Sequence, residues 1–202
     1  QSRLQAIAWQ TLGFIAQATG EHAQAETHFR EALALTYPEQ KLYERTRTMN
    51  ALTHSLHDLG RTEEALVLYQ ELTDLLQPTP YTLDKLEVGI NWGALLYSLG
   101  DLDQAETIFR QTESVANTVE GMTIPKAHLA NNIGCVLRDK KAWHFAELYL
   151  KRSLSLWQQV GDPFFIIKSQ LNLAKLYLQS KKVVVATDTL EQAQTLLHPH
   201  QE

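Results

Sequence analysis

The sequence is poor in the residues that crosslink a chain or turn it sharply. It has a single cysteine, Cys135, together with 9 glycines and 6 prolines in 202 residues. One cysteine excludes an intramolecular disulfide and a zinc site built from several cysteines. It also agrees with a reducing compartment, so we expect a cytoplasmic protein. The scarcity of glycine and proline argues against an all-β chain, which needs these residues at its many turns.

The sequence also lacks an excess of positive charge and a long apolar run. There are 18 lysines and arginines against 23 acidic residues, for a formal charge of -5, and this balance argues against nucleic-acid binding. The most apolar stretch, Val88–Leu99, is interrupted by polar residues and falls short of the ~18 residues that span a bilayer. We therefore expect no nucleic-acid partner and no membrane partner. The N-terminus has no Met and no signal-peptide core, so we expect a piece of a longer protein.

The sequence does contain an internal repeat. Segments 20–26, 60–66 and 100–106 each begin with glycine and have alanine in the sixth place, and weaker copies follow at 141–147 and 181–187. Because residues four apart share one face of a helix, each alanine and the bulky residue after it form a helical pattern. The bulky apolar residue stands four places after each alanine: Phe29, Tyr69, Phe109, Leu150 and Leu190.

A second series of small residues precedes the first series in every repeat. Its members are Gly13, Thr53, Gly93, Gly134 and Ala174. Both series have spacings of 40, 40, 41 and 40 residues. One inserted residue, which we place in the loop around 117–121, therefore shifts both series together.

These patterns predict five antiparallel helix pairs, in which helix A carries the small residue and helix B carries the alanine and the bulky knob. A glycine in the left-handed conformation ends helix A. Proline stands at or near the start of the next pair, at Pro38, Pro80, Pro125 and Pro163. Asp162-Pro163 and Thr79-Pro80 match an N-cap residue followed by a first-turn proline. The strand-prone run at 183–185 is assigned to a helix because the repeat includes it. The predicted helices are 3–19, 22–36, 39–59, 62–77, 80–99, 102–117, 124–139, 142–159, 163–180 and 183–197.

No helix pair can bury its apolar face alone, so neighbouring pairs must stack. We predict an all-α fold, a right-handed superhelical solenoid of five helix-turn-helix repeats with helix A lining the concave side. The repeats cover residues 3–37, 38–78, 79–120, 121–161 and 162–199 of a single domain, 1–202.

The pattern resembles the tetratricopeptide repeat (TPR) family, whose signature is Trp-x2-Leu-Gly-x2-Tyr, then Ala-x3-Phe, then Pro. The first repeat matches it with Trp9-x2-Leu12-Gly13, Ala25-x3-Phe29 and Pro38. The period of 40 in place of 34 overlaps HEAT and armadillo repeats, so a HEAT-like solenoid is the alternative. The knob and the glycine turn favour a long TPR unit. Such a unit is similar to kinesin light chain and to the sensor arms of bacterial signalling ATPases and transcription regulators.

The histidines do not complete a site for catalysis or metal binding. His54 and His57 share a helix face but have no third metal ligand near them in sequence. His128 and Cys135 are separated by about 10 Å of helical rise, which is too far for a thiolate–imidazole pair. We therefore expect no catalytic residue, no metal and no cofactor, and hence no enzyme.

Asparagine recurs at one position of helix A. Asn91, Asn132 and Asn172 each lie two residues, or about 200° of helical turn, before the small residue, on the face turned away from the packed side. Asn50 and Asn131 lie one residue further back. A side-chain amide can pair with the backbone of an extended peptide, and the peptide groove of the O-linked N-acetylglucosamine transferase is similar. Alternatively, each asparagine bonds to the neighbouring helix A.

The same face carries several basic residues, and Glu87 is its only acid. A basic groove on an acidic chain favours an acidic or carboxylate-bearing ligand, whereas the alternative is an ordinary solvated face. The predicted ligand groove consists of Arg47, Asn50, His54, His57, Asn91, Tyr97, His128, Asn132, Arg138, Lys168, Asn172 and Lys175.

Three functions are compatible with this sequence. The first is a non-enzymatic module that captures a protein or an extended acidic peptide in its groove. By resemblance, it would be the scaffold or sensor of a bacterial signalling or transcription-regulatory protein. The second is a small-molecule sensor for a sugar or metabolite, resembling the helical arm of the bacterial maltose regulator, with Phe14 and Tyr97 as groove aromatics. The third is a structural oligomerisation arm.

The last predicted helix, 183–197, has an apolar face that no later helix covers. Its exposed candidates are Val184, Val185, Leu190, Leu196 and Leu197. Because solenoids normally cap such an end, we expect either self-association through the C-terminal helix or contact with a flanking domain.

Overall fold

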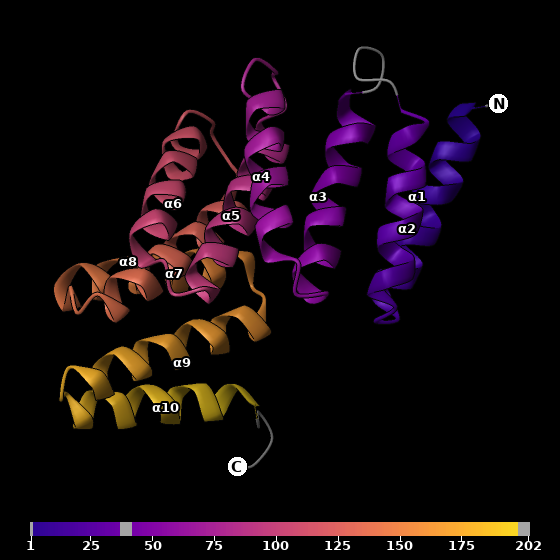
Figure 1. Cartoon of the computed structure of the whole chain (residues 1–202). Helices are drawn as coiled ribbons and strands as arrows, with labels where there is room; N and C mark the ends of the chain where they lie inside the picture. The colour runs from indigo at the N-terminus through magenta and orange to yellow at the C-terminus, as the bar shows by residue number, and fades with distance from the viewer. Residues whose placement is uncertain (1, 37–41, 198–202) are drawn as a thin grey trace. The chain divides into compact units, whose positions relative to one another are not determined.

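The computed structural model describes residues 2–36 and 42–197 of the chain, and these residues form α-helices connected by short turns (Figure 1). In chain order the helices are α1 (Ser2–Ala18), α2 (His22–Ala34), α3 (Leu42–Asp58), α4 (Thr62–Leu76), α5 (Thr82–Ser98), α6 (Leu102–Asn117), α7 (Thr123–Asp139), α8 (Trp143–Val160), α9 (Pro163–Gln179) and α10 (Val183–Leu197). The prediction of an all-α chain with five helix pairs is confirmed. None of the described helices is both long enough and apolar enough to cross a lipid bilayer.

The predicted helix boundaries agree with these ranges to within three residues. The strand-prone run at 183–185 begins α10, and Asp162 caps α9 by accepting hydrogen bonds from the backbone N–H groups of Phe164 and Phe165. Pro125 lies in the first turn of α7, near the helix start as predicted. The N-cap prediction was wrong for Thr79, because Thr79 and Pro80 both precede the first residue of α5 by two or more positions. Pro38 and the predicted helix start at 39 lie outside the described residues.

The extra residue of the third repeat lies at the end of α6. Helix α6 has 16 residues where α4 has 15, and each is followed by a five-residue connection, 77–81 or 118–122. The shift therefore enters at Asn117, the first residue of the predicted window. From α7 onward both repeat series keep the new register.

The turn from helix A to helix B requires a left-handed residue in every repeat. Gly20, Gly60 and Gly100 have φ angles of 75° to 81° at this position. In the last two repeats the same position is occupied by Lys141 and Lys181, with φ angles of 62° and 63°. Glycine adopts this conformation without steric cost, whereas lysine does so under strain.

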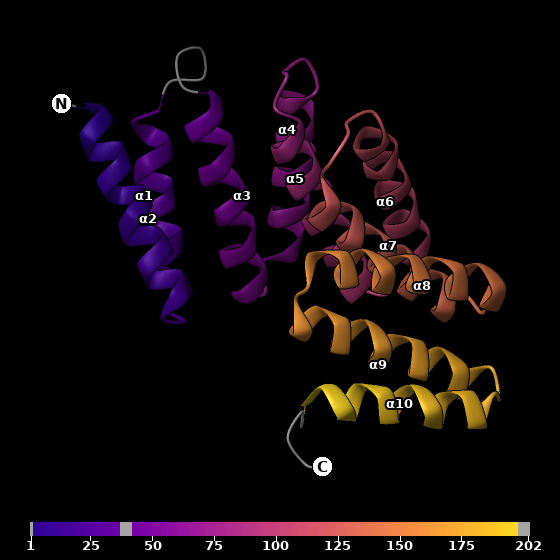
Figure 2. The ribbon, with the colours of Figure 1, turned by 180° about the vertical axis from the view of Figure 1, so that it is seen from behind.

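The chain divides into two compact units, 1–88 and 89–202, and the division falls within α5. In the first unit α1 and α2 lie side by side, and α3 packs against both α2 and α4. In the second unit α7 packs against α6 and α8, and α9 packs against α8 and α10. Figures 1 and 2 view the chain from opposite sides, and both show α9 and α10 lying alongside each other.

Within a repeat, the small residue of helix A lies against the knob of helix B. A Cβ atom added to Gly13 would lie 2.4 Å from Phe29 Cε1, and one added to Gly93 would lie 2.5 Å from Phe109 Cε1. In the second repeat Thr53 and Tyr69 replace this pair and both are buried. Burial raises the pKa of Tyr69 to about 12, although a hydrogen bond with Thr53 acts in the opposite direction. The small residue therefore sets how closely the two helices approach.

Ion pairs join consecutive repeats. The residue directly after the repeat alanine is glutamate in three repeats, and each glutamate accepts from a basic residue at the A–B turn of the next repeat. The pairs are Glu26 with Arg61, Glu106 with Lys140 and Glu147 with Lys182.

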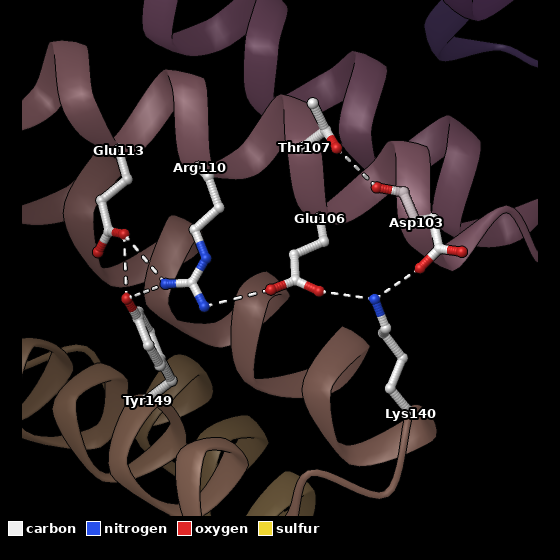
Figure 3. A network of polar contacts seen from close by, with 7 residues as sticks. All are labelled: Asp103, Glu106, Thr107, Arg110, Glu113, Lys140 and Tyr149. Carbon is white, nitrogen blue, oxygen red and sulfur yellow. Dashed lines mark hydrogen bonds and ion pairs between the residues drawn. The ribbon is translucent and has the colours of Figure 1, made fainter.

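The second unit extends the Glu106–Lys140 pair into a network (Figure 3). Lys140 also binds Asp103, while Arg110 donates to both Glu106 and Tyr149. Tyr149 of α8 in turn donates to Glu113 of α6. These contacts link α6 to the following repeat, and Asp103 is the network residue whose side chain is largely exposed.

Candidate functional site

The helix-A surface of the second unit brings three of the recurring asparagines together. Asn172 on α9 donates from Nδ2 to Oδ1 of Asn131 on α7 over 2.7 Å, and Asn131 donates to Oδ1 of Asn132 over 3.2 Å. The amides of two neighbouring A helices thus form a continuous chain of hydrogen bonds.

The residue three places before the small position links neighbouring A helices in three repeats. Gln10 of α1 donates to Thr48 of α3, Asn50 of α3 donates to Glu87 of α5, and Asn131 of α7 accepts from Asn172 of α9. The alternative in which the asparagine braces the neighbouring helix therefore applies to Asn50, Asn131 and Asn172. The predicted groove position lies two places before the small residue, whereas these bracing residues lie three places before it. The polar residues at 10, 50 and 131 were the available signal for this bracing.

Each end of the amide chain has one hydrogen-bonding group without a partner among the described residues. Within the described residues, Nδ2 of Asn132 has no acceptor and Oδ1 of Asn172 has no donor. Both side chains are partly exposed. The surface therefore offers one donor and one acceptor, the two groups that a peptide backbone requires.

Two exposed lysines lie on the same helix as Asn172. Lys168 and Lys175 stand four residues before and three residues after it, which places all three on one face of α9. Neither lysine forms an ion pair with a described residue, although Lys168 lies over the Phe165 ring at 5.9 Å. Exposed Leu171 adjoins the same face. We call Asn132, Asn172, Lys168 and Lys175 the amide–lysine surface.

Aromatic rings fix His128 at one end of this surface. Its ring makes edge-on contacts with Trp157 of α8 and Phe165 of α9, with centroid distances of 4.9 and 5.1 Å. Burial lowers the pKa of His128, and the charge of Lys168 lowers it further. The imidazole is thus held in its neutral form at neutral pH and serves as part of an aromatic cluster.

Arg138 does not present a free charge to this surface. Its side chain is buried, and its guanidinium donates to Asp139 over 2.8 Å and to the Tyr97 hydroxyl over 3.0 Å. The Tyr97 hydroxyl donates to Asp139. Burial alone would raise the pKa of Asp139, but hydrogen bonds from Arg138 and Tyr97 outweigh it and keep this pKa below its usual range. Arg138 and Tyr97 therefore form an internal network instead of a ligand contact.

The other candidate pair, His128 and Cys135, offers no nucleophile. Cys135 is buried beside the Arg138 guanidinium, and burial raises the pKa of its thiol. The protonated thiol is a poor nucleophile at neutral pH.

The first unit places two of the remaining predicted residues, Arg47 and Asn50, in a mixed-charge patch. Arg47 is exposed next to Asp84 and Glu87, and Asn50 lies buried between them. Burial raises the pKa of Glu87, and the neighbouring carboxylate of Asp84 raises it further. Glu87 is thus accompanied by a second acid, so this part of the predicted groove is not basic.

His54 and His57 are exposed on α3. Although the His54 side chain reaches solvent, the protein around its ring partly desolvates it and lowers its pKa, an effect opposed by Asp58. The described residues contain no group of three histidine, cysteine or carboxylate side chains that could hold a metal ion.

A groove of about 510 Å³ in the first unit lies outside the predicted site. Its apolar lining includes Met49, Leu52 and Leu56 of α3, and Val67 of α4 forms part of its wall. Arginines and glutamates line the remainder of the groove. No sequence pattern distinguished this groove, because its apolar residues follow the same helical pattern as the core.

The repeated helix pairs, the left-handed turn and the knob against a small residue define a TPR-like repeat protein, a class whose members are typically non-catalytic scaffolds. The profile of the MalT-like TPR region family matches residues 10–201. The chain therefore belongs to this family. No curated protein matches the sequence.

Solved structures of low sequence identity share the fold. BtubC (BKLC) from P. vanneervenii is 18% identical with a TM-score of 0.84, covering 95% of this chain and 79% of the other. Putative kinesin light chain TPR-like repeats from Podosopora anserina are 17% identical with a TM-score of 0.79, covering 100% and 98%. Aspartyl phosphate phosphatase F from Bacillus subtilis is 11% identical with a TM-score of 0.79, covering 97% and 60%.

Proposed function

We propose that this chain is a non-enzymatic binding module that captures an extended, acidic segment of a protein on the amide–lysine surface. The observation that carries the proposal is the arrangement on α9, where two lysines without ion pairs among the described residues flank a partly satisfied amide. In contrast, Arg61, Lys140 and Lys182 are engaged in ion pairs between repeats.

The chemistry of the surface supports an extended ligand. Nδ2 of Asn132 would donate to a peptide carbonyl, and Oδ1 of Asn172 would accept from a peptide N–H. Lys168 and Lys175 would attract carboxylates, which strengthens binding at low ionic strength and speeds association. By family membership the module would serve as the scaffold or sensor of a cytoplasmic signalling or transcription-regulatory protein.

A fluorescence anisotropy titration with labelled octaglutamate tests the proposal, with octalysine as the peptide of opposite charge. We expect octaglutamate to bind and octalysine not to bind. The double variant Lys168→Gln, Lys175→Gln should lose octaglutamate binding, and Asn132→Ala should weaken it roughly tenfold by removing one hydrogen bond.

The matched control is Lys181→Gln, which neutralises an exposed lysine at the α9–α10 turn and should leave binding unchanged. Unaltered octaglutamate binding by the double lysine variant, or equal binding of octalysine, would overturn the proposal.

The apolar groove of the first unit supports a second candidate function, the sensing of a small apolar metabolite. Its volume lies within the ~300–1,000 Å³ range of small-molecule sites. A thermal-shift screen of metabolites should then give stabilising compounds whose effect disappears in Val67→Asp. Persistence of every stabilising effect in that variant would exclude the groove.

A further inference from the structure

The groove of the first unit has an equivalent place in the second unit, with which it can be compared. In the first unit α2 and α4 form the walls of the groove and α3 forms its floor. All of its lining residues lie between Arg30 and Glu71, well inside the chain. In the second unit α6, α8 and α7 hold the same positions of the repeat. The two places therefore correspond residue by residue.

An aromatic side chain spans the equivalent place in the second unit (Figure 3). The guanidinium of Arg110 lies over the ring of Tyr149, 4.9 Å from its centroid, and donates to its hydroxyl. The same hydroxyl donates to Glu113 of α6 over 3.1 Å. One ring and two charged side chains thus connect helix B of one repeat to helix B of the next.

The first unit has leucines where the second unit has the ring and its acceptor. Leu68 stands three places after the repeat alanine, as Tyr149 does, and Leu33 stands eight places after it, as Glu113 does. Both leucines line the groove and are half-buried. A leucine side chain is shorter than that of tyrosine and forms no hydrogen bond, so the space between α2 and α4 remains open.

The positive charge beside the ring is nevertheless retained in the first unit. Arg30, which lines the groove, stands five places after the repeat alanine, as Arg110 does. Each arginine pairs with the glutamate one turn before it, Arg30 with Glu26 over 2.8 Å and Arg110 with Glu106 over 3.3 Å. A guanidinium at the edge of an apolar space attracts the face of an aromatic ring.

We propose that the groove binds a small molecule through an aromatic ring, which lies where the ring of Tyr149 lies in the second unit. The ring packs against Leu33 and Leu68 beside the Arg30 guanidinium. This inference rests on the second candidate function, the sensing of a small apolar metabolite, and names its class of ligand. The enclosed edge of the ring should carry no hydroxyl, because Leu33 offers no acceptor in the place of Glu113.

Three alcohols of similar shape test the proposal: phenethyl alcohol, its saturated analogue cyclohexylethanol and its phenolic analogue tyrosol. Titrations that follow the methyl NMR signals of Leu33, Val67 and Leu68 give their dissociation constants. We expect phenethyl alcohol to bind and tyrosol to bind no more tightly. In Arg30→Gln, phenethyl alcohol should lose roughly threefold in affinity relative to cyclohexylethanol, the effect of one cation–π contact at a surface site.

Two further substitutions transfer the arrangement of Tyr149 into the first unit. Leu68→Tyr places a ring of the chain itself in the groove and should abolish the binding of all three alcohols. Leu33→Glu supplies the acceptor and should improve tyrosol roughly tenfold relative to phenethyl alcohol. The matched control is Gln70→Tyr, because Gln70 is exposed on α4 and does not line the groove. This variant should bind like the unaltered chain.

The ring and the groove can fail separately in these measurements. Methyl signals that phenethyl alcohol does not shift, or binding that persists in Leu68→Tyr, would overturn the proposal. If the relative affinities stay unchanged in Arg30→Gln or in Leu33→Glu while Leu68→Tyr abolishes binding, the metabolite groove stands and the placement of the ring is wrong. Circular dichroism establishes that each variant remains folded, which is expected because the substituted side chains reach solvent.

Discussion

Asn172 on α9 donates its side-chain amide to Asn131 on α7 over 2.7 Å, and this bond joins the A helices of two successive repeats. Asn131 is the central residue of the chain of three amides, because it also donates to Asn132. Asn131 thus acts in bracing the helices, while Asn132 retains a free donor toward the surface.

Replacing Asn131 should therefore affect stability, and replacing Asn132 should not. Asn131→Ala removes two hydrogen bonds and should lower the free energy of unfolding by about 1 kcal/mol, after allowance for the better helix propensity of alanine. Asn132→Ala removes one longer bond and should be close to neutral. Urea denaturation followed by circular dichroism compares the two. Equal stability of both variants would contradict the bracing role of Asn131.

The left-handed lysines offer a stabilising substitution. Lys141→Gly should raise the free energy of unfolding by about 0.5–1 kcal/mol, because glycine adopts φ = 62° without the steric cost borne by lysine. Lys181→Gly should behave likewise. The control is Lys140→Gly, at an ordinary φ of -78°, which should destabilise by removing the ion pairs with Asp103 and Glu106. A lower melting temperature for Lys141→Gly would show that the turn is not strained.

The contact between Gly93 and Phe109 should not tolerate even a methyl group. Gly93→Ala places Cβ 2.5 Å from the ring, so we expect a loss of about 1–3 kcal/mol from overpacking. The same substitution in a Phe109→Ala background should cost much less, because the ring that it strikes is absent. A double-mutant cycle measured by chemical denaturation gives this coupling. If the destabilising effects of Gly93→Ala and Phe109→Ala were additive, the strain would not arise from the contact between the new Cβ and the ring.

The ion pairs of Glu147 predict a pH dependence. Hydrogen bonds from Lys151, Lys182 and Tyr177 outweigh burial and lower the pKa of Glu147 from 4.5 to about 2. Its contribution to stability is therefore fully present above about pH 5 and is lost as the pH falls toward 2.

Glu147→Gln should melt at a lower temperature than the unaltered chain at pH 7, by an amount that corresponds to no more than about 1 kcal/mol for a partly exposed network. The two melting temperatures should converge as the pH falls toward 2. Glu31→Gln, which removes an exposed carboxylate with no ion pair among the described residues, should show no such trend. A difference that stays constant with pH would mean that the charge of Glu147 is not involved.

The repeat pattern predicted the helices well because local periodicity determines them. The spacing of Gly13, Gly93 and Gly134 located three A helices, and the turns at Gly20 and Gly100 located the ends of two of them. The boundary at Pro80 was less predictable, because proline is tolerated at several positions around a helix start.

The candidate site was less predictable, because it depends on which side chains meet across repeats. Arg138 lies at a groove position by helical angle, yet Asp139 and Tyr97 draw it into the interior. Asp84 and Glu87 stand three residues apart on α5, and Arg47 of α3 lies beside them only because the two helices pack together. Lys168 and Lys175 remain at the surface, as the helical angle predicted, but their lack of ion-pair partners among the described residues became visible only in three dimensions.

Within each unit, every described helix contacts only its neighbours in the chain or the next helix of the same kind. Opening one end of such an array does not require the middle to open, because the contacts are local. Among the described helices α10 packs against α9 alone, so its amide protons should exchange with solvent sooner than those of α7 and α8. A contact made on α10 would be registered there as slower hydrogen exchange long before the remainder of the chain responded.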